Sequence, residues 1–394
     1  MLAEFRGRWI AFLVVFVVKV CADQLVLVQS VFRHGDRTPE GRYPTDPYKE
    51  SFWPASYGEL TTVGMQQQLT QGLKLRARYQ VEENFLPKDY KDFNIYVRSS
   101  DVNRTLMSAY SQLEGFFSAS SNTYPSENAV WPGRYTPVPV HTVDILTDNL
   151  MIASLPCARR TQLQQARAKN AQYQAFIAQQ RPLLNTIAQN GGFNGTSSSF
   201  DPYKAFTDFY SSISVETIYN LQLPDWVTPA LWLEFTYGNY RSNEFLAGEA
   251  GFGVPEDPEL LSLGGGTLLQ TLISNMDLAI SGSSKVRYRM FSGHETTLGA
   301  LLRTLGAKEA LLGLPLSDYA AVLLFELWKS TTNYKDYYYI RMVYSANDHS
   351  PFKTVTQLIK GCSGASNCDL NAFKSRSEPY FPKGGNMTYA CVTQ

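Results

Sequence analysis

The sequence predicts an α/β fold: a three-layer core with a mixed, mostly parallel sheet flanked by helices, and an inserted, mostly α-helical cap. Three short apolar runs, at 25–31, 93–97 and 288–291, have the composition of buried strands. Segments with apolar residues at helical spacing lie between them. The middle of the chain, residues 151–259, differs in character, since it is rich first in Gln, Ala and Arg and then in aromatic residues.

The helices and strands divide the chain into two parts. Three segments of the first and last thirds have helical periodicity: 60–79, 102–117 and 295–305. A polar turn at 330–335 between two apolar runs predicts an antiparallel hairpin. We therefore expect residues 23–150 and 260–394 to form the α/β core and residues 151–259 to form the helical cap.

The N-terminal residues have the features of a secretory signal peptide. Arg6 and Arg8 precede the apolar run 9–18, and Ala22 offers a small residue for cleavage. We expect residues 1–22 to be removed and the product to be secreted or luminal. We expect no membrane anchor in the mature chain, because no apolar stretch near the C-terminus is long enough to span a bilayer.

The composition is that of a globular protein with an aromatic excess. The chain has 394 residues, of which 44% are hydrophobic, and it includes 24 Tyr and 22 Phe. This is enough apolar material for a large core. The formal net charge is zero, so the composition favours neither a nucleic acid nor an anionic membrane surface as a partner.

The most informative motif is RHGDRTP at residues 33–39, directly after the first predicted strand. Two arginines beside a histidine are costly to bury, because like charges repel and must be desolvated. The arrangement suits a phosphoryl group, since the guanidiniums of Arg33 and Arg37 can each bind two phosphate oxygens. The imidazole of His34 can attack phosphorus as a nucleophile.

The other two predicted strands also end in ionisable residues. Arg98 follows the second strand, and His294 and Glu295 follow the third. Open α/β sheets place ligand sites at the carboxyl ends of their strands. We therefore expect Arg98 to hold phosphate oxygens with the other arginines, His294 to donate to a phosphate oxygen and Glu295 to protonate the leaving group.

This constellation predicts an acidic optimum and no cofactor. Glu295 must be protonated to act as an acid, and an unperturbed glutamic acid titrates at about 4.3. The arginines supply the positive charge, so we expect neither a metal ion nor another cofactor. The sequence has no His-x-His pair and no His-Glu-x-x-His motif.

The cysteines and sequons agree with a secreted chain. Removal of Cys21 with the signal peptide leaves Cys157, Cys362, Cys368 and Cys391. Three disulfide pairings are possible, and the short separation of Cys362 from Cys368 favours that pair, which leaves Cys157 to Cys391. N-glycosylation sequons occur at Asn103, Asn194 and Asn386.

The motif and its surroundings resemble the histidine acid phosphatases, in particular the secreted prostatic and lysosomal types. The resemblance rests on residues 33–39, on VRSSDVNRTLMSA at 97–109, on PVHT at 139–142, on SGHETT at 292–297 and on the Cys362–Cys368 segment. It implies a metal-independent phosphomonoesterase with an α/β core and a helical cap, often a homodimer. It places the nucleophile on His34, the phosphate ligands on Arg33, Arg37 and Arg98, and the second histidine on His294.

The chain departs from the family pattern in three ways. Mammalian members usually have Asp where this chain has Glu295, whose side chain is one methylene longer. A third disulfide of those relatives is missing, since Val215 and Val322 stand at the corresponding positions. The Asn103 sequon follows Arg98 closely and so lies near the expected pocket.

Two alternatives remain open. A phytase-like or inositol-phosphate phosphatase has the same signature and needs extra cations for several phosphates. The expected cap offers four such cations: Arg159, Arg160, Arg167 and Lys169. A catalytically weakened secreted glycoprotein of the same fold is the other alternative, because Glu295 departs from the family pattern.

Overall fold

The computed structural model describes residues 23–125, 130, 131, 133, 135–194, 199–332, 335–362 and 364–392. The predicted signal peptide, including Cys21, lies outside the described residues. None of the helices within the described part is long and apolar enough to cross a membrane.

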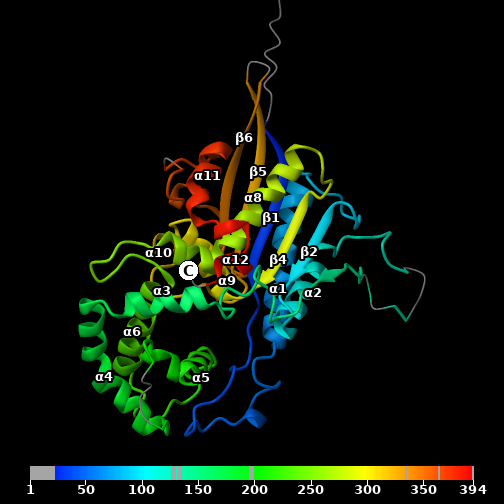
Figure 1. The fold of residues 1–394 in the computed structure, drawn as a ribbon. Coiled ribbons are helices and arrows are strands. Elements are labelled where there is room, and N and C mark those ends of the chain that lie inside the picture. Colours follow the sequence, from blue (N-terminus) through cyan, green and yellow to red (C-terminus); the bar gives the residue numbers. More distant parts are fainter. Residues whose placement is uncertain are drawn as a thin grey trace, which may run out of the picture.

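A mixed sheet runs through the centre of the molecule (Figure 1). Its strands are β1 (Gln24–Arg33), β2 (Ile95–Ser99), β3 (Val140–His141), β4 (Tyr288–Gly293), β5 (Val322–Thr332), β6 (Lys335–Ser345), β7 (Lys353–Thr354) and β8 (Cys368–Asp369). The order across the sheet is β3-β2-β4-β1-β5-β6-β7, and β8 also pairs with β6. The three apolar runs correspond to β1, β2 and β4, which are adjacent.

The sheet has a parallel half and an antiparallel half. The neighbours β3, β2, β4 and β1 are mutually parallel, whereas β5, β6, β7 and β8 pair in antiparallel fashion. The prediction of a mixed sheet is confirmed. The antiparallel share is larger than expected, because the C-terminal hairpin joins β1 directly and the chain adds its last short strands to β6.

Helices cover both faces of the sheet, as predicted. On one face, α1 (Thr62–Arg76) and α2 (Asn103–Phe116) pack against Val28 and Phe32 of β1. On the other face, α8 (Thr267–Ile280) and α9 (Glu295–Thr304) pack against Leu27 and Val31 of the same strand. Alternate side chains of β1 therefore enter two separate cores, which explains its unbroken apolar sequence.

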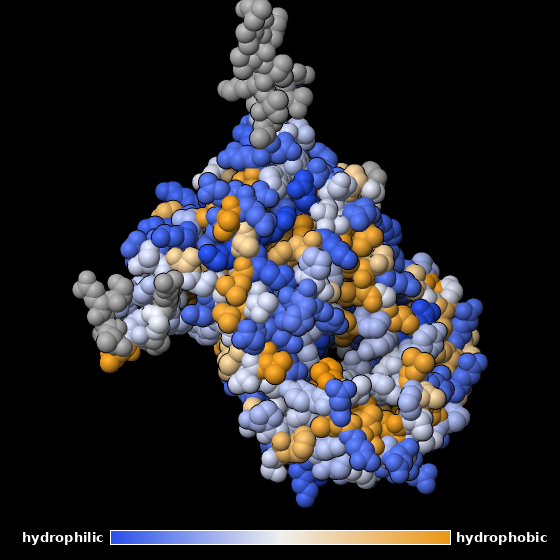
Figure 2. Space-filling model, turned by 180° about the vertical axis from the view of Figure 1, so that it is seen from behind, coloured by the Kyte–Doolittle hydropathy of each residue, from blue (hydrophilic) through white to orange (hydrophobic). Residues whose placement is uncertain are grey.

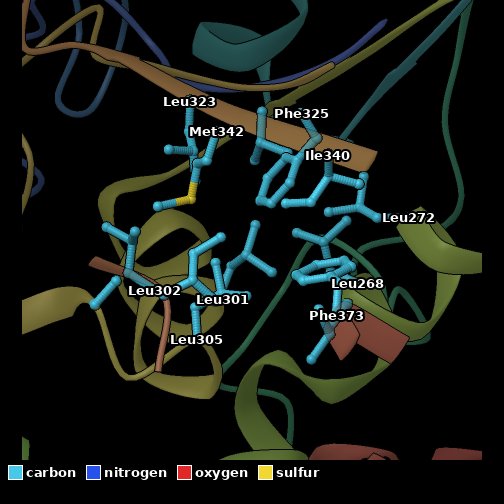
Figure 3. Packing of buried hydrophobic residues seen from close by; sticks show 14 of the residues in the cluster. Leu268, Leu272, Leu301, Leu302, Leu305, Leu323, Phe325, Ile340, Met342 and Phe373 are labelled. Carbon is cyan, nitrogen blue, oxygen red and sulfur yellow. The ribbon is translucent and has the colours of Figure 1, made fainter. Parts of the chain in front are cut away.

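The second of these cores is built from leucines and aromatic residues (Figure 3). Leu301 and Leu302 of α9 lie opposite Leu323 and Met342 of the sheet, and the side chains point toward one another. All four are fully buried. Each buried aliphatic side chain contributes about 1.5–3 kcal/mol to the stability of this packing. The packing holds α9 against the sheet and so fixes the position of its first residues.

The segment between the two halves of the core is helical. It contains α3 (Ala158–Ala168), α4 (Ala171–Gly191), α5 (Thr207–Ile218) and α6 (Pro229–Ala247). These helices surround an aromatic cluster of their own that includes Phe206, Phe209, Phe235 and Phe245. The aromatic excess of the sequence thus forms a third core. In Figure 2 the surface is hollowed where the lower part of the molecule meets the part above it.

Shorter elements complete the chain. They are α7 (Pro258–Leu261), α10 (Lys308–Leu312), α11 (Leu370–Ser377), α12 (Met387–Ala390), π-helical turns at Ala77–Glu82 and Ser262–Gly266, and 3₁₀ turns at Glu50–Phe52, Pro202–Phe206, Thr356–Leu358, Glu378–Tyr380 and Lys383–Gly385. The structure contains both favoured disulfides, Cys157–Cys391 and Cys362–Cys368. The first joins the start of α3 to the end of α12.

Candidate active site

The register of the parallel strands brings the two histidines together. Arg33 of β1 lies opposite Gly293 of β4, so His34 and His294 follow at the same edge of the sheet. The backbone N–H of His34 donates to the carbonyl oxygen of Gly293 over 3.0 Å. The centroids of the two imidazole rings are 5.5 Å apart. Residues separated by 260 positions in the sequence therefore share one site.

A close backbone contact fixes the turn after His34. A Cβ atom on Gly35 would lie 2.3 Å from the carbonyl oxygen of Gly64, and one on Gly64 would lie 2.3 Å from the carbonyl oxygen of Asp36. Only glycine fits at both positions, because any side chain would overlap the opposite backbone. This contact presses the first turn of α1 against residues 35 and 36 and holds the signature loop in place.

The His34 imidazole has one free nitrogen. Its Nδ1 lies 2.8 Å from the carbonyl oxygen of Gly35, which can only accept, so Nδ1 carries the proton. Nε2 is therefore left with its lone pair, and it is buried without a hydrogen-bond partner. Burial, and then the charge of Arg33, holds the pKa of His34 well below its usual 6.5. The ring is a neutral base with its lone pair available.

Glu295 occupies the space in front of this nitrogen. Its Oε2 lies 3.6 Å from His34 Nε2 and 3.1 Å from Arg33 Nε. Burial by itself raises the pKa of the Glu295 carboxyl, but Arg33 and the other charges around it lower that pKa by more, so the net shift is strongly downward. Glu295 is consequently ionised in the free protein.

The two signature arginines are held by neighbouring backbone and hydroxyl oxygens. Arg33 donates to the Ser317 carbonyl oxygen over 2.7 Å, and its guanidinium lies 4.1 Å from the ring centroid of Tyr319. Arg37 is buried and donates to the Thr38 carbonyl oxygen over 3.0 Å and to Ser211 Oγ of α5 over 3.4 Å. Both arginines are among the charges that lower the pKa of Glu295.

The structure places Arg98 differently from the prediction. Its Nη2 lies 2.6 Å from Oδ2 of Asp148, and both side chains are buried. Its Nη1 donates to the Ser99 carbonyl oxygen. The described contacts of Arg98 are therefore with Asp148 and the Ser99 carbonyl oxygen, and they do not include His34, His294 or Glu295.

Arg104, which the sequence analysis did not select, lies at the site instead. It stands on the first turn of α2, and its Nη2 is 3.4 Å from Nδ1 of His294 and 2.8 Å from Oε1 of Glu40. Arg104 also contributes to lowering the pKa of both His34 and His294. The predicted helix from residue 102 places Arg104 soon after the end of the second strand, but the helix pattern does not show which charges the side chain meets.

His294 is held from both sides of its ring. Arg104 can only donate, so Nδ1 of His294 accepts, and Nε2 donates to Ser100 Oγ over 3.0 Å. Burial, and then Arg104, lowers the pKa of His294 to about 4. The ring is neutral, and in this arrangement its only proton points toward Ser100 rather than toward Glu295. The predicted donation to a phosphate oxygen would require that hydrogen bond to change.

The three sequon asparagines are all exposed. Asn103 is exposed beside Arg104 and donates to Glu59 Oε1 over 3.0 Å. Asn194 is exposed, and the Thr196 of its sequon lies outside the described residues. Asn386 is exposed and caps α12. Within the described ranges there is no group of three or more His, Cys, Asp or Glu residues that could hold a metal ion.

The site as a whole is a cluster of guanidiniums near two neutral imidazoles and the Glu295 carboxylate. Arg33, Arg37 and Arg104 can bind the oxygens of a tetrahedral anion, and His34 Nε2 can attack its central atom. In the free protein, Glu295 stands in for that anion.

Known proteins are similar in sequence to this chain over most of its length. Residues 24–345 match the family described as "Histidine phosphatase superfamily (branch 2)". The chain is 31% identical to the prostatic acid phosphatase of Homo sapiens over 376 residues, which cover 95% of this chain and 89% of that protein. It is 32% identical to the lysosomal acid phosphatase of Xenopus laevis over 362 residues, which cover 90% and 76%.

Solved structures share the fold. The phytase of Klebsiella sp. ASR1 superposes with a TM-score of 0.61 at 18% identity, over 95% of this chain and all of that one. The phytase of Hafnia alvei in complex with myo-inositol hexakis sulphate superposes with a TM-score of 0.61 at 16% identity, over 94% and 99%. At these identities the likeness establishes the fold alone.

We predict that His294 makes the folded state less stable in acid. Between pH 6.5 and about 4 the unfolded chain binds a proton at His294 that the folded chain does not, so the free energy of unfolding falls as the pH falls. One such site contributes a slope of about 1.4 kcal/mol per pH unit. Denaturant unfolding of wild type and His294→Gln from pH 4 to 7 should show a shallower fall in the variant. Parallel curves would contradict the lowered pKa.

Proposed function

The chain belongs to branch 2 of the histidine phosphatase superfamily, and we propose on this basis that it is an acid phosphatase that hydrolyses phosphate monoesters through a phosphohistidine intermediate. The observation that carries the proposal is His34 Nε2, a neutral, buried nitrogen with no hydrogen-bond partner, near the charges of Arg33 and Arg104. A structural histidine in a core would have a partner on both nitrogens.

In the first step, the lone pair of Nε2 attacks phosphorus and the ester P–O bond breaks. The bonding electrons go to the leaving oxygen, and Glu295 gives that oxygen a proton. Arg33, Arg37 and Arg104 hold the three other oxygens and stabilise the charge that they carry in the transition state. In the second step, water attacks the phosphohistidine and gives its proton to Glu295. The P–N bond breaks, and orthophosphate leaves.

Substrate binding must first displace Glu295. Reacting atoms need to approach within about 3–3.5 Å, and Glu295 Oε2 already lies 3.6 Å from Nε2, where phosphorus has to be. A phosphate dianion on Arg33 replaces the carboxylate and cancels the charge that keeps its pKa low. The same event therefore releases Glu295 toward the leaving group and allows its carboxyl to be protonated. We accordingly expect the acidic optimum in kcat, which reports on the enzyme–substrate complex.

The alternative of a phytase-like enzyme has less support. Arg159 pairs with Glu259, Arg160 donates to the carbonyl oxygens of Leu155 and Leu263, and Arg167 donates to three backbone carbonyl oxygens. These guanidiniums brace the helical segment. Nothing in these contacts favours a polyphosphorylated substrate, and Lys169, the fourth of the cations, is exposed.

The wider properties of the protein follow from the same proposal. We propose that residues 1–22 are a signal peptide and that the enzyme acts in a secreted or luminal compartment, glycosylated at Asn103, Asn194 and Asn386. Residues 23–150 and 260–394 would form the catalytic core and residues 151–259 its cap, with a homodimer as the assembly. The exposed position of all three asparagines supports the glycosylation.

The test of the function is the replacement of the nucleophile. His34→Ala should lower the turnover of an aryl phosphate by about 10⁴-fold or more at saturating substrate, because the proposed route passes through a bond to His34 Nε2. Wild type quenched during turnover of a ³²P-labelled substrate should carry label that survives base and is lost in acid, as a P–N bond does. His349→Ala, at an exposed histidine, is the control. A base-labile label, or near-normal turnover by His34→Ala, would refute the proposal.

A second prediction concerns Glu295. Glu295→Gln keeps the shape of the side chain but cannot transfer a proton, so hydrolysis of alkyl phosphates should slow by about 10²–10³-fold. Nitrophenyl phosphate should slow far less, because nitrophenolate leaves without protonation. The measurement is kcat for both esters in wild type and variant. Equal slowing of both would argue against a proton donor at this position.

A third prediction separates the two arginines. Arg104→Gln should weaken inhibition by orthophosphate and lower kcat/KM by about 10²–10³-fold, because it removes a phosphate ligand. Arg98→Gln should instead cost about 3–5 kcal/mol in the free energy of unfolding, because it leaves the buried Asp148 carboxylate unpaired. The measurements are the inhibition constant of orthophosphate and the free energy of unfolding in denaturant for both variants. Weaker phosphate binding in Arg98→Gln, with a loss of stability in Arg104→Gln, would show instead that Arg98 binds the phosphate.

A further inference from the structure

We propose that Glu40 is a specificity-determining residue of this site: its carboxylate, paired with Arg104 at the solvent side, selects against esters whose leaving group carries further anionic groups. The inference rests on the proposed phosphatase function and names the substrate class within it, namely monoesters with a neutral leaving group.

Glu40 is in direct contact with the arginines of the site. Its Oε1 lies 2.8 Å from Nη2 of Arg104 and 3.8 Å from Nη2 of Arg37. Its backbone N–H donates to Ser211 Oγ over 2.9 Å, and the same hydroxyl accepts from Arg37. The carboxylate thus lies between the signature loop and α2, and the Glu40 backbone is bonded to α5. A change of charge at Glu40 therefore acts directly on Arg104 and Arg37.

Glu40 also lies on the open side of the cluster. Its side chain is 39% exposed, whereas those of Arg33, Arg37 and Arg104 are 13%, 7% and 15% exposed. His34 is fully buried beneath them. A phosphoryl group on His34 and the arginines must therefore direct its ester oxygen toward solvent, and the leaving group emerges beside the Glu40 carboxylate.

Electrostatics then discriminates among leaving groups in two ways. A second phosphate on the leaving group would approach Glu40 through a partly desolvated region, where like charges a few ångströms apart repel by more than they do in water. Glu40 also neutralises part of the charge on Arg104, which lowers the attraction of this side of the site for a second anionic group. An ester with an uncharged leaving group meets neither penalty.

The experiment compares wild type with Glu40→Gln, which keeps size and hydrogen bonding and removes the charge. The activity arm measures kcat/KM for myo-inositol hexakisphosphate and for phenyl phosphate. The binding arm measures the dissociation constants of myo-inositol hexakissulfate and of orthophosphate by calorimetry. In the activity arm, we expect the ratio of kcat/KM for the inositol ester to that for phenyl phosphate to rise about tenfold in the variant. In the binding arm, we expect the affinity for the hexakissulfate relative to orthophosphate to rise by about the same factor. Both increases should become smaller as salt is added.

Glu59→Gln is the matched control. Glu59 belongs to the same segment, but its carboxylate accepts from the Asn103 amide over 3.0 Å, and the described ion pairs do not include it. The control should shift both ratios by less than twofold. A Glu40→Gln ratio within twofold of wild type, or an equal shift in Glu59→Gln, would overturn the inference. The absence of turnover of either ester would refute the phosphatase function, and the binding arm would still decide the role of Glu40.

Discussion

The site depends on the burial of an uncharged imidazole among positive charges. The Gly35 carbonyl oxygen binds Nδ1 of His34, which leaves Nε2 with its lone pair, and burial with Arg33 nearby keeps that lone pair unprotonated. The guanidiniums that help to keep His34 unprotonated would repel one another without a carboxylate among them. Glu295 supplies that compensating charge.

Two carboxylates pair with arginines of the site, and these carboxylates are more exposed to solvent than the carboxylate of a buried ion pair nearby. Glu295 pairs with Arg33 and Glu40 pairs with Arg104, and both carboxylates are partly exposed. Arg98 and Asp148 are both buried and close on each other. A phosphate can replace a partly exposed carboxylate at moderate cost, whereas separating a buried pair would leave two unpaired charges. Under the proposed function, this difference would leave Arg33 and Arg104, but not Arg98, available to a substrate.

The helical segment contributes to the site through α5. Ser211 of α5 bonds Arg37 and the Glu40 backbone, and the Tyr219 hydroxyl donates to Asp36 Oδ2 over 2.6 Å. Burial, and then the neighbouring Asp46 carboxyl, raises the pKa of Glu216 to about 8. The signature loop is therefore braced on one side by α1 and on the other by α5.

The sequence by itself determined the sheet strands, the helices on either side and the residues that are consecutive with them. Arg33, His34 and Arg37 belong to one loop, and His294 and Glu295 follow one strand, so their positions depend on local structure that apolar patterning reveals. The choice of Arg104 over Arg98 and the contact of Glu40 with Arg104 were decided only by the tertiary structure. Arg98 finds Asp148 fifty residues away, and Arg104 is turned toward His294 by the first turn of α2. Such pairings depend on which charges burial brings together, and no local pattern in the chain carries that information.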